Sequence, residues 1–256
     1  MAPEATAPSL PWLQPDEPFP PTDLTWGPND PIDGLLAAGA DLSVARLVSA
    51  YSQGIFPWYS KGQPILWWSP NPRMVLPPQA FKCHPSLRKT IRAGLKSGQL
   101  KVTFDQAFDR VIEHCAQVHR PGQGGTWIVR DMVKAYQALH RAGVAHSIEV
   151  WQHENLVGGL YGVQLGRMVF GESMFSLQSN ASKIALTALV GYARHHSIEL
   201  IDCQQNTQHL ASLGAHEIPR REFVHTVKAA VVAPTAQWQF DSLYWDLVLN
   251  PSATHP

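Results

Sequence analysis

The sequence predicts an α+β fold in which a small proline-rich N-terminal region precedes a larger domain built on a mixed β-sheet. Fifteen of the 21 prolines fall within the first 78 residues, where the chain must consist largely of turns and extended pieces. Beyond residue 85 the spacing of apolar residues changes from helical to strand-like and back. With 256 residues, 45% hydrophobic and 16% charged, the chain can bury a large core, which excludes a disordered or fibrous protein.

Helices account for much of the predicted structure. Ser43 is a suitable N-cap for a helix at about 43–53, which Gly54 ends. Apolar residues at every fourth position, Leu87, Ile91 and Leu95, define a helix at 85–96. The same periodicity predicts further helices at 105–119, 131–141, 179–196 and 220–232.

Strand-like runs lie between the helices of the second half. Three follow one another at 146–151, 156–166 and 168–175, and a fourth follows the helix of 179–196, at 198–203. The order strand, strand, strand, helix, strand predicts a sheet with both antiparallel and parallel neighbours. We therefore expect a loose tail at 1–20, a small domain at 21–78 and a larger domain at 79–256.

Charge is distributed unevenly along a chain whose net charge is zero. Residues 1–45 contain seven acidic and no basic residues, whereas residues 46–141 contain fourteen basic and four acidic ones. The helix of 85–96 collects Arg88, Lys89, Arg92 and Lys96 on the side opposite its apolar residues. A face of one charge sign favours contact with phosphate over a merely solvated surface, so a polyanionic partner is expected.

Several functional classes lack their signature. No apolar run approaches the roughly 20 residues of a membrane helix, and the N-terminus has no secretory signal. Three widely spaced cysteines indicate free thiols in a reducing compartment, the cytoplasm. The histidines and cysteines at 114, 115, 119, 195 and 196 lack metal-ligand spacing, and no P-loop or dinucleotide motif occurs. We expect no metal and no organic cofactor.

Two short polar segments are candidates for chemistry. Glu172 lies within an apolar strand, facing either solvent or a polar pocket, and Phe175 excludes a serine-hydrolase elbow at Ser173. Strand alternation points Asp202 and Gln204 to one face and the cysteine between them to the other. That pair marks either a site or a strand leaving the core.

The loop tryptophans are a third candidate group. Trp58 and Trp127 lie in regions rich in proline or glycine. Such residues either cap a core or stack on nucleic-acid bases, and the basic region nearby suits the second interpretation.

Taken together, these segments resemble the bacterial leucyl/phenylalanyl-tRNA–protein transferases. The matching stretches are GIFPW (54–58), ILWWSPNPR (65–73), TWI (126–128), AHSIEVW (145–151), LVGGLYGV (156–163), GESMFS (171–176), NASKIAL (180–186), IDCQ (201–204) and SLGAHEIPRREF (212–223). The resemblance implies a GNAT-type acyltransferase domain behind the small N-terminal domain. It also implies transfer of leucine or phenylalanine from leucyl- or phenylalanyl-tRNA to an N-terminal Arg or Lys, which marks the acceptor protein for N-degron degradation.

The resemblance also assigns roles to single residues. Gln204 accepts a hydrogen bond from the α-amine of the acceptor, Asp202 orients and polarises Gln204, and Glu172 helps to hold the acceptor. The substrate-contacting positions are Trp58 and Trp127 beside the terminal adenosine, Gly171 and Ser173 beside Glu172, and Leu160, Met174, Leu189 and Ile201 around the transferred side chain. The family carries Met and Phe at the positions of Leu160 and Leu189, which could shift the leucine-to-phenylalanine preference.

Two alternatives remain open at this stage. An enzyme of the same fold could attach the amino acid to a cell-wall precursor instead of a protein. A non-enzymatic module could bind RNA or read N-degrons, and would gain nothing from the pair Asp202 and Gln204. The expected protein is a monomer that does not contact membranes.

Overall fold

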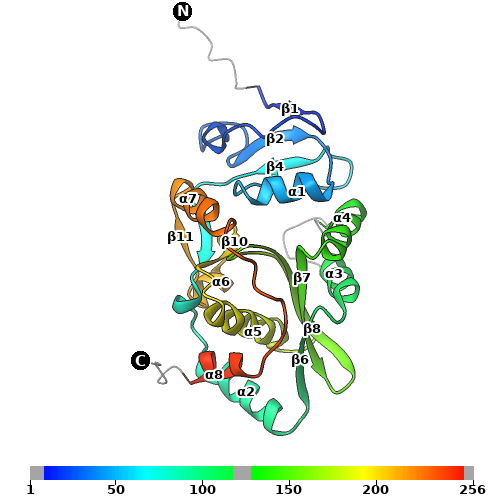
Figure 1. Ribbon diagram of the computed structural model, residues 1–256, viewed down its shortest axis with the longest axis vertical. Helices are drawn as coiled ribbons and strands as arrows, with labels where there is room; N and C mark the ends of the chain where they lie inside the picture. The colour runs from blue at the N-terminus through cyan, green and yellow to red at the C-terminus, as the bar shows by residue number, and fades with distance from the viewer. Residues whose placement is uncertain (1–8, 118–127, 251–256) are drawn as a thin grey trace, which may run out of the picture.

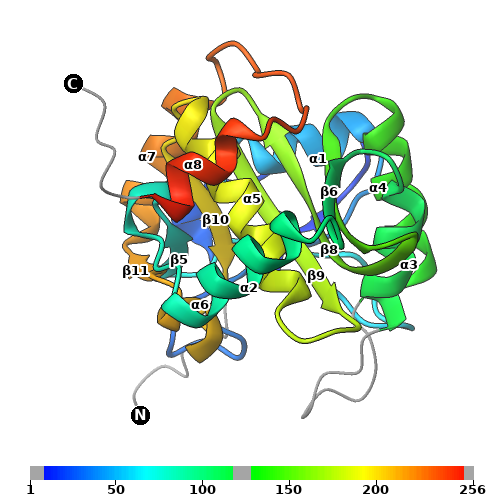
Figure 2. The same cartoon turned by 90° about the horizontal axis from the view of Figure 1, so that it is seen from below.

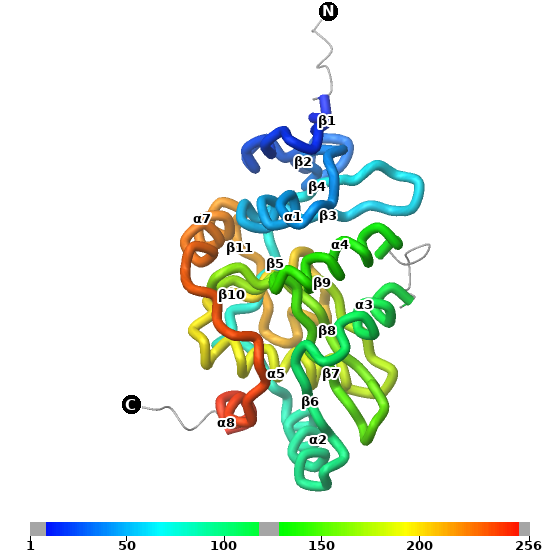
Figure 3. Tube along the Cα trace, turned by 45° about the vertical axis from the view of Figure 1, so that its right-hand side comes forward, coloured from blue at the N-terminus to red at the C-terminus, as the bar shows by residue number. Residues whose placement is uncertain are grey.

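The computed structural model describes residues 9–117 and 128–250, which form two β-sheets with helices around them. Figure 1 shows the smaller sheet at the N-terminal end of the molecule and the larger sheet below it, with α1 between them. The tube in Figure 3 shows the same stacking from another side.

The smaller sheet has four short strands in the order β1-β2-β4-β3. Its strands are β1 (Trp12–Leu13), β2 (Leu35–Gly39), β3 (Phe56–Pro57) and β4 (Leu66–Trp68), accompanied by the helix α1 (Val44–Tyr51) and the 3₁₀ turn η1 (Thr22–Leu24). A second 3₁₀ turn, η2 (Pro78–Ala80), follows β5 (Arg73–Leu76) of the larger sheet. As predicted, Ser43 caps α1, because its hydroxyl accepts the Arg46 N–H.

The larger sheet has seven strands in the order β11-β5-β10-β9-β8-β7-β6. They are β5 (Arg73–Leu76), β6 (Leu100–Phe104), β7 (Ala145–Gln152), β8 (Asn155–Leu165), β9 (Met168–Ser176), β10 (Leu200–Gln204) and β11 (His216–Ile218). Strands β6 to β9 are antiparallel, and β9 pairs with β10 in parallel. The prediction of a mixed sheet is confirmed.

Helices cover both faces of this larger sheet (Figure 2). On one face lie α2 (Pro85–Lys96), α5 (Ala181–His195) and α8 (Leu243–Leu249); on the other lie α3 (Phe108–Gln117) and α4 (Arg130–Arg141). Helix α6 (Gln208–Ser212) follows β10, and α7 (Arg220–Ala230) buries Phe223 and Val227 in the same core as α3 and α4. Each face has its own apolar core, and α1 joins the core of α3 and α4.

Most predicted boundaries lie within a few residues of the observed ones, and the exceptions have local causes. The helix predicted from 105 begins at Phe108, because Asp105 has a φ of 55° and its carboxylate accepts hydrogen bonds from the neighbouring strand. Helix α5 begins at Ala181 rather than at 179, since Asn180 has a φ of 69°. The end predicted at 119 lies outside the described residues.

A loose tail was expected at residues 1–20, but residues 9–20 pack against the rest of the smaller sheet's region. Leu13 and Phe19 are buried, and Arg46 donates hydrogen bonds to the carbonyl oxygens of Gln14 (3.2 Å) and Glu17 (2.7 Å). The predicted boundary at 78 and 79 assigns β5 to the first domain, whereas β5 pairs within the larger sheet. No helix within residues 9–117 and 128–250 is long and apolar enough to span a membrane.

Candidate active site

A pocket opens where β9 and β10 part. Their parallel pairing ends at Phe170 and Asp202, and the residues that follow on both strands line a cavity of about 160 Å³. Residues 56–58 of the N-terminal region close one side of it. The apolar wall comes from β8, β9, β10, α5 and α6 and consists of Leu160, Met174, Leu186, Leu189, Ile201 and Leu210. All four residues predicted to surround the transferred side chain therefore lie around one cavity.

Glu172 forms the polar floor of this pocket. The residue is 7% exposed, and its carboxylate accepts hydrogen bonds from the hydroxyls of Tyr51 (2.7 Å) and Tyr136 (2.9 Å). The Gln204 side-chain amide donates a third, at 3.0 Å. Burial raises the pKa of Glu172 to about 7, although the two tyrosine hydrogen bonds act in the opposite direction. The carboxyl therefore titrates near neutral pH.

Asp202 lies beneath Gln204, and Arg73 balances the negative charge of its carboxylate. The Arg73 guanidinium donates from Nε to Oδ1 (2.8 Å) and from Nη2 to Oδ2 (2.6 Å), and both side chains are fully buried. Oδ1 also accepts the backbone N–H of Gln204 at 2.9 Å. Asp202 thus holds the backbone of Gln204 rather than its side chain, which differs from the contact expected from the sequence. Glu172 is the pocket carboxyl without a cationic partner among the described residues.

A bulge in β10 directs Gln204 into the pocket. The register with β5 shifts between Asp202 and Gln204, and Gln204 has a φ of 62°. The shift breaks strict alternation, so Cys203 borders the pocket as well, contrary to the expected opposite face. Burial raises the pKa of its thiol, which keeps it protonated. The side-chain oxygen of Gln204 has no hydrogen-bond partner among the described residues.

The remaining predicted contact residues lie at the pocket margin or outside the described chain. Gly171 and Ser173 line the pocket on either side of Glu172. A Cβ at Gly171 would lie 3.2 Å from the Asp202 carbonyl oxygen, so glycine lets the two strands approach closely. Trp58 lies on the rim, with its ring centroid 5.4 Å from that of Trp68. Trp127 lies outside the described residues.

The basic helix lies away from this pocket. Figure 1 places α2 at the end of the molecule opposite the smaller sheet. Arg92 donates to the Leu249 carbonyl (2.9 Å), and Arg88 donates to the Cys83 carbonyl (3.3 Å). Lys89 and Lys96 are exposed. The predicted phosphate-binding face is thus partly engaged in contacts within the chain.

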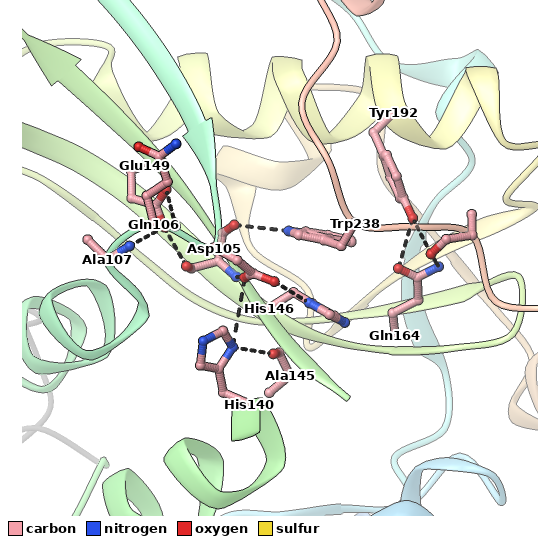
Figure 4. Close-up of polar contacts among 12 residues, drawn as sticks. Asp105, Gln106, Ala107, His140, Ala145, His146, Glu149, Gln164, Tyr192 and Trp238 are labelled. Carbon is pink, nitrogen blue, oxygen red and sulfur yellow. Dashed lines mark hydrogen bonds and ion pairs between the residues drawn. The ribbon is translucent and has the colours of Figure 1, made fainter. Parts of the chain in front are cut away.

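Within the described residues, one group of side chains has the composition of a metal site (Figure 4). The ligand atoms of Asp105, His140 and His146 lie within 4.8 Å of one another. Nδ1 of His146 donates to Asp105 at 2.6 Å, and Nδ1 of His140 donates to the Ala145 carbonyl at 2.9 Å. These hydrogen bonds occupy Nδ1 of both histidines, and they join α4, β7 and the residue that follows β6. We assign the group a structural role.

Sequence reasoning missed three residues that shape the site. Tyr51 and Tyr136 lie within the helices predicted at 43–53 and 131–141, and Arg73 ends the segment ILWWSPNPR, but none of the three was predicted to belong to the site. A buried tyrosine hydroxyl needs a hydrogen-bond partner, which is the signal that could have drawn attention to both. Arg73 gave no such signal, since its partner lies 129 residues further along the chain.

Comparison with known proteins identifies a family. Two family profiles match: "Leucyl/phenylalanyl-tRNA protein transferase" over residues 75–228, and the N-terminal domain of the same name over residues 40–71. A leucyl/phenylalanyl-tRNA–protein transferase from a Polaromonas species is 59% identical over 94% of this chain and 94% of its own length. The protein of the same name from Paraburkholderia phytofirmans is 57% identical over 95% of this chain and its full length. A solved structure, L-PGS from Bacillus licheniformis, aligns over 69% of this chain and 57% of its own, with 8% identity and a TM-score of 0.37, which is too low to bear on the fold.

Proposed function

The chain belongs to the leucyl/phenylalanyl-tRNA–protein transferase family, and on that premise we propose that it moves leucine or phenylalanine from charged tRNA to the N-terminal Arg or Lys of acceptor proteins. One observation carries the chemical part of the proposal. The Gln204 amide, held by the buried Glu172, stands at the polar end of an otherwise apolar cavity. The apolar wall could hold the side chain of the transferred amino acid, while the polar end holds the acceptor amine.

The chemistry needs little more than positioning. The acceptor amine attacks the carbonyl carbon of the aminoacyl ester, a C–N bond forms, and the C–O bond to the tRNA ribose breaks. One proton leaves the amine, and one is gained by the ribose oxygen. With a reference pKa of roughly 7.7–8.0, the amine is partly neutral near pH 7, so a strong base is unnecessary. Gln204 would accept a hydrogen bond from this amine through its unpartnered side-chain oxygen and so orient its lone pair.

Selection of a cationic acceptor would rest on Glu172. The Asp202 charge is balanced by Arg73, whereas the groups that donate hydrogen bonds to Glu172 within residues 9–117 and 128–250 are all neutral. Burial without a cation raises the pKa of Glu172 to about 7. A bound guanidinium or ammonium would lower this pKa again and form a charge-assisted hydrogen bond.

The cavity volume suits the transferred side chain alone. At about 160 Å³ it lies well below the roughly 300–1,000 Å³ of pockets that enclose a drug-sized ligand. The terminal adenosine would therefore rest outside, against Trp58 at the rim and Trp127. The acceptor stem would contact the basic face of α2 through phosphates, without reading base sequence.

Several broader features belong to the same proposal. The larger sheet, with antiparallel β6 to β9 and a parallel β9–β10 pair, supports a GNAT-type acyltransferase domain behind a small proline-rich N-terminal domain. The enzyme would act as a monomer in the cytoplasm, where charged tRNA is available, without a metal or organic cofactor. Its products would be recognised as N-degrons.

A transfer assay tests the proposal against its two alternatives. Purified protein is mixed with radiolabelled leucyl-tRNA and a peptide beginning with Arg, or a matched peptide beginning with Ala, without added metal or coenzyme A. Label on the Arg peptide alone is expected. Absence of label from both peptides would contradict the proposal, and label on a cell-wall precursor instead would identify the other acceptor class.

A further inference from the structure

Arg73 lies directly beneath the pocket and does not line it. Its side chain is fully buried, and the guanidinium is stacked between the rings of Phe56 and Phe223, whose centroids lie 4.7 and 4.5 Å from Cζ. These rings come from β3 of the smaller sheet and from α7 beside the larger sheet, so residues from both parts of the fold hold the guanidinium in place. We propose that Arg73 is a positioning residue for aminoacyl transfer, which holds Gln204 in its reactive orientation through Asp202; this inference rests on the proposed function.

The first link is the ion pair itself. Nε and Nη2 donate in parallel to the two oxygens of Asp202, at 2.8 and 2.6 Å, with both side chains excluded from solvent. A planar fork of this kind fixes the plane of the carboxylate as well as its charge. The remaining guanidinium nitrogen, Nη1, has no hydrogen-bond partner among the described residues. The polar contacts of Arg73 are thus directed at Asp202.

The second link runs from Asp202 to the backbone of Gln204. Oδ1, the atom that faces Nε of Arg73, also accepts the Gln204 N–H at 2.9 Å. Gln204 has a φ of 62°, in a region that non-glycine residues rarely adopt, at the point where β10 shifts register against β5. Bulges beside active sites commonly redirect a side chain, and here the carboxylate holds the bulge in place.

The third link is the Gln204 side chain. Its amide nitrogen donates to Oε1 of Glu172 at 3.0 Å, which leaves its oxygen for the acceptor amine. Arg73 therefore acts three contacts away from the reacting atoms. Lysine could keep the charge but could not form the fork, so Arg73→Lys would free the carboxylate to rotate and release the bulge.

A double-mutant cycle separates positioning from simple stability. Leucine transfer to an Arg-initiated peptide is measured in single turnover for the wild type, Arg73→Lys, Gln204→Ala and the double variant. Arg73→Lys alone should lower the rate by about 10²-fold, as small misplacements of a reacting group do. In the Gln204→Ala background the same change should have little further effect, because the residue that it positions is gone. Binding of charged tRNA should be retained in every variant.

Arg46→Lys is the matched control. Arg46 is likewise buried and stacks on Phe19, but its hydrogen bonds go to backbone carbonyls of the N-terminal lobe. Its effect on the transfer rate should be small and should add to that of Gln204→Ala. If Arg73→Lys does not fold, Phe223→Leu removes one stacking face and should give a smaller loss that again disappears with Gln204→Ala.

Two results would overturn the inference. One is a wild-type rate in folded Arg73→Lys, and the other is an equal loss with and without Gln204. Either would leave the proposed function intact, since the wild type would still transfer leucine. A wild type without transfer would instead remove the proposed function itself.

Discussion

Replacing Glu172 with glutamine should stabilise the protein at high pH. The carboxyl lies in a buried setting that raises its pKa from 4.5 to about 7. Between these values the folded protein retains a proton that the unfolded chain has lost, so the free energy of unfolding falls as pH rises. A shift of this size corresponds to about 3 kcal/mol, fully developed above about pH 7. Glutamine stays neutral and avoids this cost.

Urea unfolding of both proteins across pH measures the effect. The two should have similar midpoints below pH 4.5, where Glu172 is protonated in both states. Near pH 8 the variant's midpoint should lie about 1 M higher, taking an m-value of about 3 kcal/mol per M. Glu154→Gln is the control, because Glu154 lies exposed in the turn between β7 and β8. A difference between wild type and Glu172→Gln that does not change with pH would refute the reasoning.

Three further outcomes are expected. Tyr136→Phe removes a hydrogen bond that lowers the Glu172 pKa, so the pH at which the transfer rate falls on the acidic side of its pH profile should rise. An unchanged profile would show that ionisation of Glu172 does not control the rate. Leu160→Trp fills the apolar cavity and should abolish leucine transfer while sparing tRNA binding. Undiminished transfer would show that the transferred leucine side chain does not bind in this cavity. Replacing Lys89 and Lys96 with glutamine should reduce the salt dependence of tRNA binding by about one unit of slope per lysine, and an unchanged slope would move the RNA surface away from α2.

Helices α1 to α5 and α7 were predictable because their signals are local, whereas the short helices α6 and α8 were not predicted. Pro85 at the first helical position and apolar residues at every fourth position define α2, whose observed bounds equal the predicted ones. The short strands β1 to β6 and β11 also escaped prediction. β5 is four residues long and begins with a charged residue, Arg73, whose burial depends on Asp202 in another strand. β6 begins shortly after the basic helix and contains the exposed Lys101, which interrupts its apolar residues.

The sequence predicted which residues lie at the candidate site, but not which hydrogen bonds and ion pairs join them. Family-like segments brought together Glu172, Gln204 and the apolar wall, and the structure places them around one cavity. The partner of each charge depended on tertiary contacts that periodicity cannot reveal. Asp202 pairs with Arg73 and contacts Gln204 only through the backbone, while two tyrosine hydroxyls and the Gln204 amide reach Glu172.

The central claim is that Glu172 supplies the uncompensated negative charge that selects the acceptor. Its most direct test compares peptides beginning with arginine or with citrulline, which has nearly the same shape and no charge, in the wild type and in Glu172→Gln. The wild type should prefer arginine by about 10- to 100-fold, the range of a charge-assisted hydrogen bond, and the variant should lose that preference. A variant that still prefers arginine to the same degree would contradict the claim.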